Sequence, residues 1–142
     1  MLRQLMLGGG VSVFNIAIHA LVMAVVIAVA EAGARTKVWH PSLFLAAVMI
    51  PTVSVLMATH ALEVMVWALA YWAVDAAPPG TDRVYFAFVN YATLGYGDIV
   101  PVPRWRLIGP ITSMNGALMF GWSTAVIFEV MRKAMERTAR PH

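Results

Sequence analysis

Residues 93–98 read Thr-Leu-Gly-Tyr-Gly-Asp and lie between two long apolar stretches of the chain. Two glycines that alternate with bulky residues form neither a stable helix nor a stable strand, so local stability does not explain them. Glycine reaches positive φ angles that other residues reach only with strain. Alternation of such residues lets successive carbonyl groups point to the same side. Four copies around an axis would form stacked rings of carbonyl oxygens that can replace the water shell of an ion.

The composition of the 142-residue chain is typical of a membrane protein. Hydrophobic residues make up 61% of the chain and charged residues 12%, whereas a soluble domain is about half apolar and about a quarter charged. The formal net charge of +3 is modest, and nothing in the sequence indicates nucleic-acid binding. The chain has no cysteine, which excludes disulfides and cysteine-based zinc sites. Its length predicts that residues 1–142 form a single membrane domain.

Three stretches are long enough to cross a bilayer, which takes about 20 apolar residues. They are residues 5–30, 43–74 and 107–131. The apolar run at 84–92 is too short to span, and we expect a re-entrant helix over residues 82–92, with Thr81 or Asp82 as its N-cap. The second stretch exceeds one crossing, so we expect Pro51 to kink it. The predicted fold is an all-α membrane protein with three transmembrane helices and a re-entrant helix between the second and third.

The basic residues of the short loops predict the orientation in the membrane. Those of the tail at 132–142 favour a cytoplasmic C-terminus and are Arg132, Lys133, Arg137 and Arg140. Arg35 and Lys37 suit the same side, so three crossings put the N-terminus and the loop at 93–98 outside, although Arg3 must then be translocated. A signal peptide is the alternative for residues 1–30, but its apolar run exceeds the usual length of roughly 7–15 residues. We therefore expect a retained transmembrane helix.

The chain resembles the pore domain of potassium channels. Residues 85–92 are similar to the aromatic-rich pore helix of that family, and residues 93–98 match its Thr-Val-Gly-Tyr-Gly-Asp filter with leucine for valine. Pro101 follows the aspartate as it often does in the family, and the third apolar stretch corresponds to the inner helix. The plan is similar to that of a small bacterial channel with an extra helix in front. The resemblance implies a homotetramer in the lipid of the bacterial cell membrane, because one filter loop per chain needs four chains.

The resemblance also implies a set of ion ligands. K⁺ ions would be bound by the Thr93 hydroxyl and by the carbonyl oxygens of Thr93, Leu94, Gly95 and Tyr96, and Gly97 and Asp98 would complete the filter. No organic cofactor is implied. Val89 stands where some relatives have a glutamate that steadies the filter aspartate, and Ala92 replaces a usual threonine or serine. Asp98 therefore needs another partner, a nearby tyrosine, tryptophan or water, and the strictness of K⁺ over Na⁺ selectivity stays open.

One face of the third stretch is predicted to line a cavity. Its residues recur at helical spacing and are Ala117, Phe120, Thr124 and Phe128. By the resemblance, Phe128 lies near the cytoplasmic constriction, where a hydrophobic ring can act as a gate; alternatively, both phenylalanines pack against neighbouring helices. Gly116 matches the hinge of the inner helix in relatives, but it would equally permit close helix packing.

His60 and Glu63 lie three residues apart, on one face of the second stretch and deep in an apolar segment. Such groups are costly in a membrane unless they are paired or neutral. One hypothesis is a pH sensor; the other is an interhelical pair that bonds Ser113, Ser123, Thr124 or Asn115. A metal site would need more ligands than these two. His19 is expected to be a lone interhelical donor.

The resulting functional prediction is a K⁺ channel without enzymatic activity that conducts passively. No stretch carries arginine at every third position, so we expect no voltage gating, and the channel would be a leak or pH-modulated. Lipid, tension or an auxiliary subunit of unknown identity could also control it. The alternatives are a weakly selective cation channel, a pore-like subunit that does not conduct without a partner or lipid, and, weakest, an enzyme or proton relay built on His60 and Glu63.

Overall fold

The computed structural model describes residues 1–33 and 40–138, and their regular structure is helical throughout, with no strand in these two ranges. The elements are α1 (Leu2–Gly33), α2 (Pro41–Ala73), α3 (Arg83–Tyr91), the short 3₁₀ helix η1 (Pro103–Trp105) and α4 (Ile108–Thr138). The predicted all-helical class is confirmed. Arg35, Lys37 and Arg140 lie outside the described residues.

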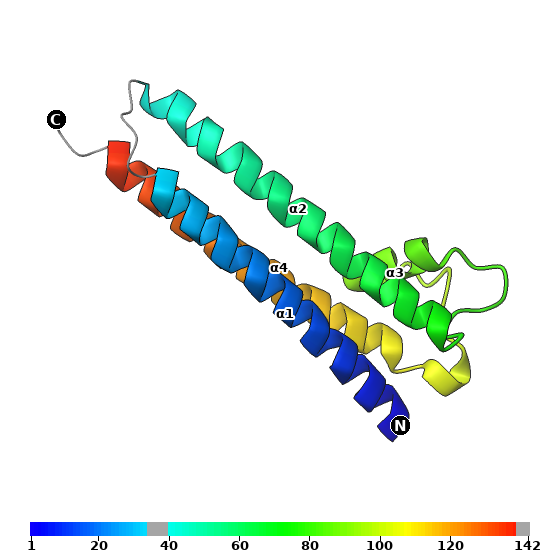
Figure 1. Cartoon of the computed structure of the whole chain (residues 1–142). Helices are drawn as coiled ribbons and strands as arrows, with labels where there is room; N and C mark the ends of the chain where they lie inside the picture. The colour runs from blue at the N-terminus through cyan, green and yellow to red at the C-terminus, as the bar shows by residue number, and fades with distance from the viewer. Residues whose placement is uncertain (34–39, 139–142) are drawn as a thin grey trace.

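The three long helices form an elongated bundle in which α1 and α4 run side by side (Figure 1). Each is long and apolar enough to cross a membrane, which confirms the three predicted spans. With 32 residues, α1 is about 48 Å long at about 1.5 Å per residue, whereas the apolar core of a bilayer is about 30 Å thick. The long helices therefore tilt in the bilayer or extend beyond its core.

Helix α2 is a single element that continues through Pro51 (Figure 1). Proline has no N–H to donate to the carbonyl one turn earlier. The hydroxyl of Thr52 donates to the carbonyl of Val48 at 2.8 Å, so a side chain supplies a bond in this turn. The proline does not end the helix or divide it into two elements.

The short helix α3 lies beside the C-terminal end of α2 and the N-terminal end of α4 (Figure 1). The Asp82 carboxylate accepts bonds from the backbone N–H groups of Val84 at 2.9 Å and Tyr85 at 3.1 Å, so Asp82 is its N-cap. The first turn of α1 reaches the same end of the bundle, where the Gln4 side chain accepts a bond from the Leu107 N–H at 2.7 Å. Parts of all four helices therefore lie at this end of the bundle.

Two buried apolar clusters hold the bundle together. The one near α3 includes the fully buried side chains of Trp67, Tyr71 and Phe86. The other lies between the opposite halves of α1, α2 and α4, around Met23 and Val130. Large apolar side chains are also exposed along the outside of the bundle, such as Phe14, Leu21, Leu69 and Trp72. Exposure of this extent suits contact with lipid rather than with water.

Candidate functional site

The loop at 93–98 begins where α3 ends, and Thr93 makes the transition. The Thr93 N–H bonds to the Asn90 carbonyl and the Leu94 N–H bonds to the Val89 carbonyl, both at 3.0 Å. These two bonds form the Schellman end of a helix, in which the residue with positive φ is usually glycine. Thr93 occupies that position with φ of 59°, at a cost of roughly 1–2 kcal/mol for an L-residue. Strain of this kind at a non-glycine residue indicates a position where the side chain itself is needed.

The positive φ angles continue at every second residue of the loop. After Thr93, Gly95 has φ of 58° and Gly97 has φ of 78°. The side chains between them are exposed in the single chain, Leu94 to 51% and Tyr96 to 67%. A Cβ built on either glycine would meet no described atom within 4 Å. The backbone has the alternation that the sequence suggested, and this loop contacts little of the described chain.

Asp98 at the end of the loop is paired with a residue of α3. The Tyr85 hydroxyl donates a hydrogen bond to Asp98 Oδ2 at 2.7 Å. This bond, more than any other cause, raises the pKa of Tyr85, because the bonded carboxylate disfavours loss of the proton. Val89 is buried in the apolar core instead of contacting the aspartate. Of the partners that the sequence left open for Asp98, a tyrosine, a tryptophan or water, the structure shows a tyrosine.

Helix α4 packs against the last turn of α3. The Ser113 hydroxyl donates to the Asn90 carbonyl at 2.8 Å. A Cβ built on Gly116 would collide with the carbonyl of Tyr91, so only glycine allows this approach of the two helices. The structure therefore gives Gly116 a packing role, and the hinge stays a prediction.

The four residues predicted to line a cavity share the exposed face of α4. They are Ala117, Phe120, Thr124 and Phe128. The ring of Phe120 still contacts residues of the same chain, with its centre 4.7 Å from that of His60 and 5.4 Å from that of Tyr91. Phe128 is 61% exposed, so it does not pack into the core of its own chain.

A buried polar cluster lies one layer away from the loop, and Glu63 is at its centre. The side chain of Glu63 is fully buried and its carboxylate oxygens face three partners. His19 Nδ1 lies 2.8 Å from Oε1, His60 Nδ1 lies 3.2 Å from Oε2, and the Tyr91 hydroxyl donates to Oε2. On the other side of the two imidazoles, Ser123 Oγ lies 2.9 Å from His60 Nε2 and 3.3 Å from His19 Nε2. We call these five residues the Glu63 cluster; it joins α1, α2, α3 and α4.

The cluster decides between the partners that the sequence left open for His60 and Glu63. Ser123 is a partner of His60, as predicted. Ser113 bonds α3 instead, and Thr124 bonds the Phe120 carbonyl of its own helix at 2.9 Å. The pair thus links helices, and whether it senses pH stays a prediction.

Sequence reasoning missed two hydrogen-bond partners of Glu63. These are His19 and Tyr91. His19 was expected to be a lone donor, but it is fully buried against Glu63, which is 44 positions away in the sequence. The polar side chain of His19 in an uncharged transmembrane stretch indicated that it needs a partner, but the sequence did not identify Glu63 as that partner.

Asparagine side chains extend the polar layer toward the loop end of the bundle. Asn15 of α1 donates to the Glu63 carbonyl at 3.3 Å and to Asn115 Oδ1 at 3.2 Å. The Trp67 indole donates to the same Asn115 oxygen at 3.0 Å. Asn115, a predicted partner of the His60 pair, thus connects α4 to α1 and α2 instead of contacting the imidazole. The N-terminal helix is bonded to the rest of the bundle through side chains, in addition to its apolar packing.

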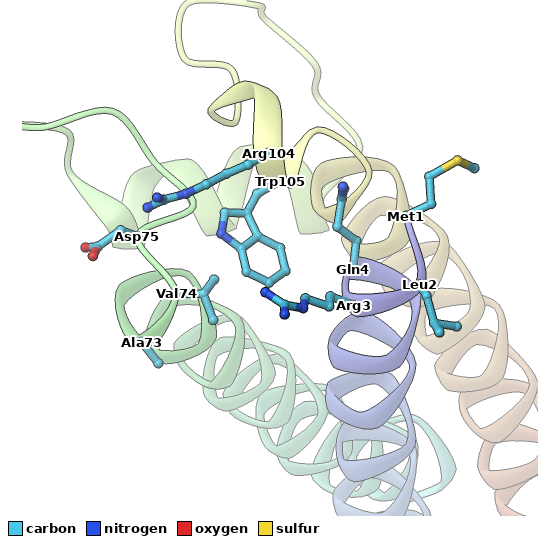
Figure 2. Close-up of a pocket in the computed structure, with 9 residues that line it drawn as sticks. All are labelled: Met1, Leu2, Arg3, Gln4, Ala73, Val74, Asp75, Arg104 and Trp105. Atoms are coloured by element: carbon cyan, nitrogen blue, oxygen red, sulfur yellow. The ribbon is translucent and has the colours of Figure 1, made fainter.

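A cavity of about 680 Å³ opens at the loop end of the bundle, apart from both sites. The first turn of α1, the end of α2 and η1 form its walls, and Figure 2 shows the Trp105 ring between Arg3 and Val74. Arg104 extends to the same side as Asp75, so the wall carries charges of both signs. None of its described lining residues belongs to a predicted site.

Comparison with known proteins adds one match. A family model described as "Ion channel" matches residues 59–133. The matched segment starts in α2 just before His60, includes α3 and the loop, and ends in α4. No curated protein and no solved structure matches the chain.

Proposed function

Because the ion channel match covers more than half of the chain, this protein belongs to the ion channel family, and we propose that it conducts K⁺ passively through the loop at 93–98. Three helices long and apolar enough to span a bilayer make it an integral membrane protein. The observation that carries the proposal is the run of positive φ angles at Thr93, Gly95 and Gly97. Such alternation lets neighbouring carbonyl groups face one axis, which is the arrangement a dehydrated cation requires.

The proposed ion ligands are backbone oxygens together with one hydroxyl group. They are the Thr93 hydroxyl and the carbonyl oxygens of Thr93, Leu94, Gly95 and Tyr96. The strained φ of Thr93 supports the role of its side chain, since glycine would adopt this angle without cost. Because carbonyl groups bind the ion, the leucine at 94 is compatible with K⁺, and no organic cofactor is needed.

We propose that the working unit is a homotetramer in which α3 is re-entrant. A carbonyl ring around K⁺ needs four strands, and each chain has one such loop. The exposure of Leu94, Tyr96 and Phe128 in a single chain supports contacts with further copies. In that assembly the exposed face of α4 lines the central cavity, and Phe128 forms the constriction.

The proposed orientation places the loop and the N-terminus outside and the C-terminus in the cytoplasm of a bacterial cell. The basic residues of the last turns of α4, Arg132, Lys133 and Arg137, support it, since cytoplasmic ends carry an excess of lysine and arginine. Arg3 lies at the opposite end, in the wall of the cavity at η1 (Figure 2). Arg83, Arg104 and Arg106 lie on the same outer side as Arg3, which gives four basic residues there against six toward the cytoplasm, so the excess of positive charge still favours this orientation.

The test is the reversal potential of the purified full-length protein in liposomes or planar bilayers with K⁺ on one side and Na⁺ on the other. A K⁺ channel gives a reversal potential that follows the K⁺ gradient and shifts little when Na⁺ is varied. A reversal potential that ignores the K⁺/Na⁺ ratio would establish a weakly selective cation channel and contradict the proposal. No flux from well-folded protein would favour a subunit that needs a partner or lipid.

A further inference from the structure

We propose that His19, His60 and Glu63 form a binding site for a transition-metal ion of the zinc type, a role separate from ion conduction. Each of the three residues offers one ligand atom, and these atoms all lie within 4.8 Å of one another. The sequence alone gave two ligands, His60 and Glu63, which are too few for a site. The packing of α1 against α2 supplies the third.

The kind and number of ligands select the metal. Two imidazoles and one carboxylate suit Zn²⁺, Co²⁺ and Ni²⁺, whereas Mg²⁺ and Ca²⁺ prefer oxygen ligands alone. A set of two histidines and one glutamate occurs at zinc sites that keep a fourth position open for water or a substrate atom. His60 and Glu63 are three residues apart on one helix, a spacing at which both side chains reach the same ion. The cluster therefore matches a zinc site with an open position.

The protons available to the cluster favour a cation among the three residues. The Tyr91 hydroxyl gives its proton to Glu63, so toward His60 Nδ1, 3.0 Å away, its oxygen can only accept. Both histidine Nδ1 atoms therefore face acceptors alone, the Glu63 carboxylate and this oxygen, and both carry protons. The two Nε2 atoms of neutral imidazoles are then both acceptors, yet both face Ser123, which has one hydroxyl proton. A metal ion bound at the two Nδ1 atoms removes this conflict, because each Nε2 then carries a proton and donates to a lone pair of Ser123.

The surroundings of the three ligands also fit a metal site. Histidine ligands of metals usually donate their second ring N–H to a fixed acceptor, and Ser123 has this position for both rings. The His60 side chain is 15% exposed, whereas those of His19 and Glu63 are fully buried. Its ring contacts Phe120, which lies on the exposed face of α4. An ion can thus enter from that face, past Phe120.

The experiment titrates the chelator-treated full-length protein, in detergent or nanodiscs, with Co²⁺ and follows its visible absorption. We expect one Co²⁺ per chain, with the intense bands of four- or five-coordinate cobalt, displacement by Zn²⁺ and no displacement by Mg²⁺. His19→Gln and Glu63→Gln each remove a ligand, so each should lower the affinity by at least the roughly 10–100-fold that loss of a supporting residue costs. His40→Gln is the matched control, because His40 is exposed at the N-cap of α2 and should leave binding unchanged.

Absence of Co²⁺ uptake by the wild type would overturn the metal site. The cluster would then hold one protonated imidazole, which supplies the second proton needed between the two Nε2 atoms and Ser123. Uptake that persists in folded His19→Gln protein would overturn the metal site as well. If that variant does not fold, X-ray absorption of the Zn²⁺-loaded wild type decides. We expect a shell of nitrogen and oxygen atoms at about 2.0–2.1 Å with two imidazoles, and a shell without imidazole would contradict the proposal. Neither result depends on whether the protein conducts K⁺.

Discussion

The loop at 93–98, which is the proposed filter, and the Glu63 cluster both adjoin Tyr91, because this residue precedes the loop in the chain and its hydroxyl bonds Glu63. The two regions are nevertheless built in opposite ways. The loop is contiguous in sequence and exposed, and its shape comes from backbone angles at Thr93, Gly95 and Gly97. The cluster is buried, and its side chains come from four helices and lie up to 104 positions apart. A backbone site depends on local residue type, whereas a side-chain site depends on how helices pack.

This difference makes separate predictions for the two regions. Changes in the loop should alter ion conduction while the fold stays intact, because few contacts of the described chain depend on the loop. Changes in the cluster should alter the stability of the fold first. Changes at Tyr91 and Gly116, where the regions meet, should alter both.

The largest effect is expected from Gly95→Ala. Its φ of 58° is unfavourable for alanine, although no described atom crowds the added methyl group. The loop should leave the conformation that aligns its carbonyl groups, and K⁺ current should be lost with little change in the thermal unfolding midpoint. Gly9→Ala is the control, because Gly9 lies in α1 with open space around it and should conduct like the wild type. Wild-type current from Gly95→Ala would contradict the assignment of the filter.

Gly116→Ala should damage both regions. The new methyl group would collide with the backbone carbonyl of Tyr91, which cannot move without shifting the end of α3. Overpacking of this kind costs about 1–3 kcal/mol of unfolding free energy, and we expect reduced current as well. Gly121 lies on the same helix with open space around it, so Gly121→Ala should keep both the unfolding free energy and the current of the wild type. A stable Gly116→Ala protein with altered gating alone would instead support the hinge.

Tyr91→Phe tests whether the cluster supports the filter. The change removes the hydroxyl that donates to Glu63 and leaves the carboxylate with the two imidazoles alone, at a cost of about 1.5–3 kcal/mol for a lost hydrogen bond to a charged group. Tyr71→Phe is the matched control, since that hydroxyl is also buried and bonds Thr112 at 2.6 Å. Both variants should unfold at lower temperature, but only Tyr91→Phe should make the K⁺ current decline faster during sustained recording. Equal decline in both would show that the cluster has no special connection to the loop.

The smallest effect on the fold is expected from Tyr85→Phe. The hydroxyl is exposed and, among the described residues, bonds only Asp98, so the unfolding midpoint should not change, whereas K⁺ selectivity should become less steady. Asp98 raises the pKa of Tyr85, so the bond is fully present below the ordinary tyrosine pKa of about 10 and is lost as pH rises through the raised value. Wild-type selectivity should therefore hold from pH 7 to about 10 and fall above it. A fall of the same size in Tyr85→Phe would separate the pH effect from this bond.

The sequence was sufficient for the parts of the molecule that depend on local patterns. Apolar runs predicted the three long helices. Asp82 was one of the two predicted N-caps of α3 and has that role. The glycines at 95 and 97 indicated positive φ angles, which both residues have. The positive φ of Thr93 was not predicted, because threonine has no local preference for it. Val89 in the sequence showed that Asp98 needs another partner, but it left a tyrosine, a tryptophan or water open, and the structure identifies Tyr85.

The cluster could be predicted only in part, because its geometry depends on helix packing. The sequence singled out His60 and Glu63 by their cost in a membrane, and it included Ser123 among the candidate partners. It could not show that α1 packs so as to bring His19 to the same carboxylate. The packing of α1 includes close approaches such as that of Gly8 to Ile111, which a single sequence does not reveal.

The order of the cluster residues along the chain has a consequence for the synthesis and membrane insertion of the protein. Chains emerge from the ribosome at roughly 5–20 residues per second, so Asn15 and His19 exist before Glu63 does, and Tyr91 and Ser123 follow on the order of seconds later. During that interval His19 of α1 can pair with the Glu63 carboxylate, in addition to His60 of α2 itself. We therefore expect α1 to pair with α2 during membrane insertion, and deleting α1 should reduce the yield of membrane-inserted protein more than it changes the current of the molecules that assemble.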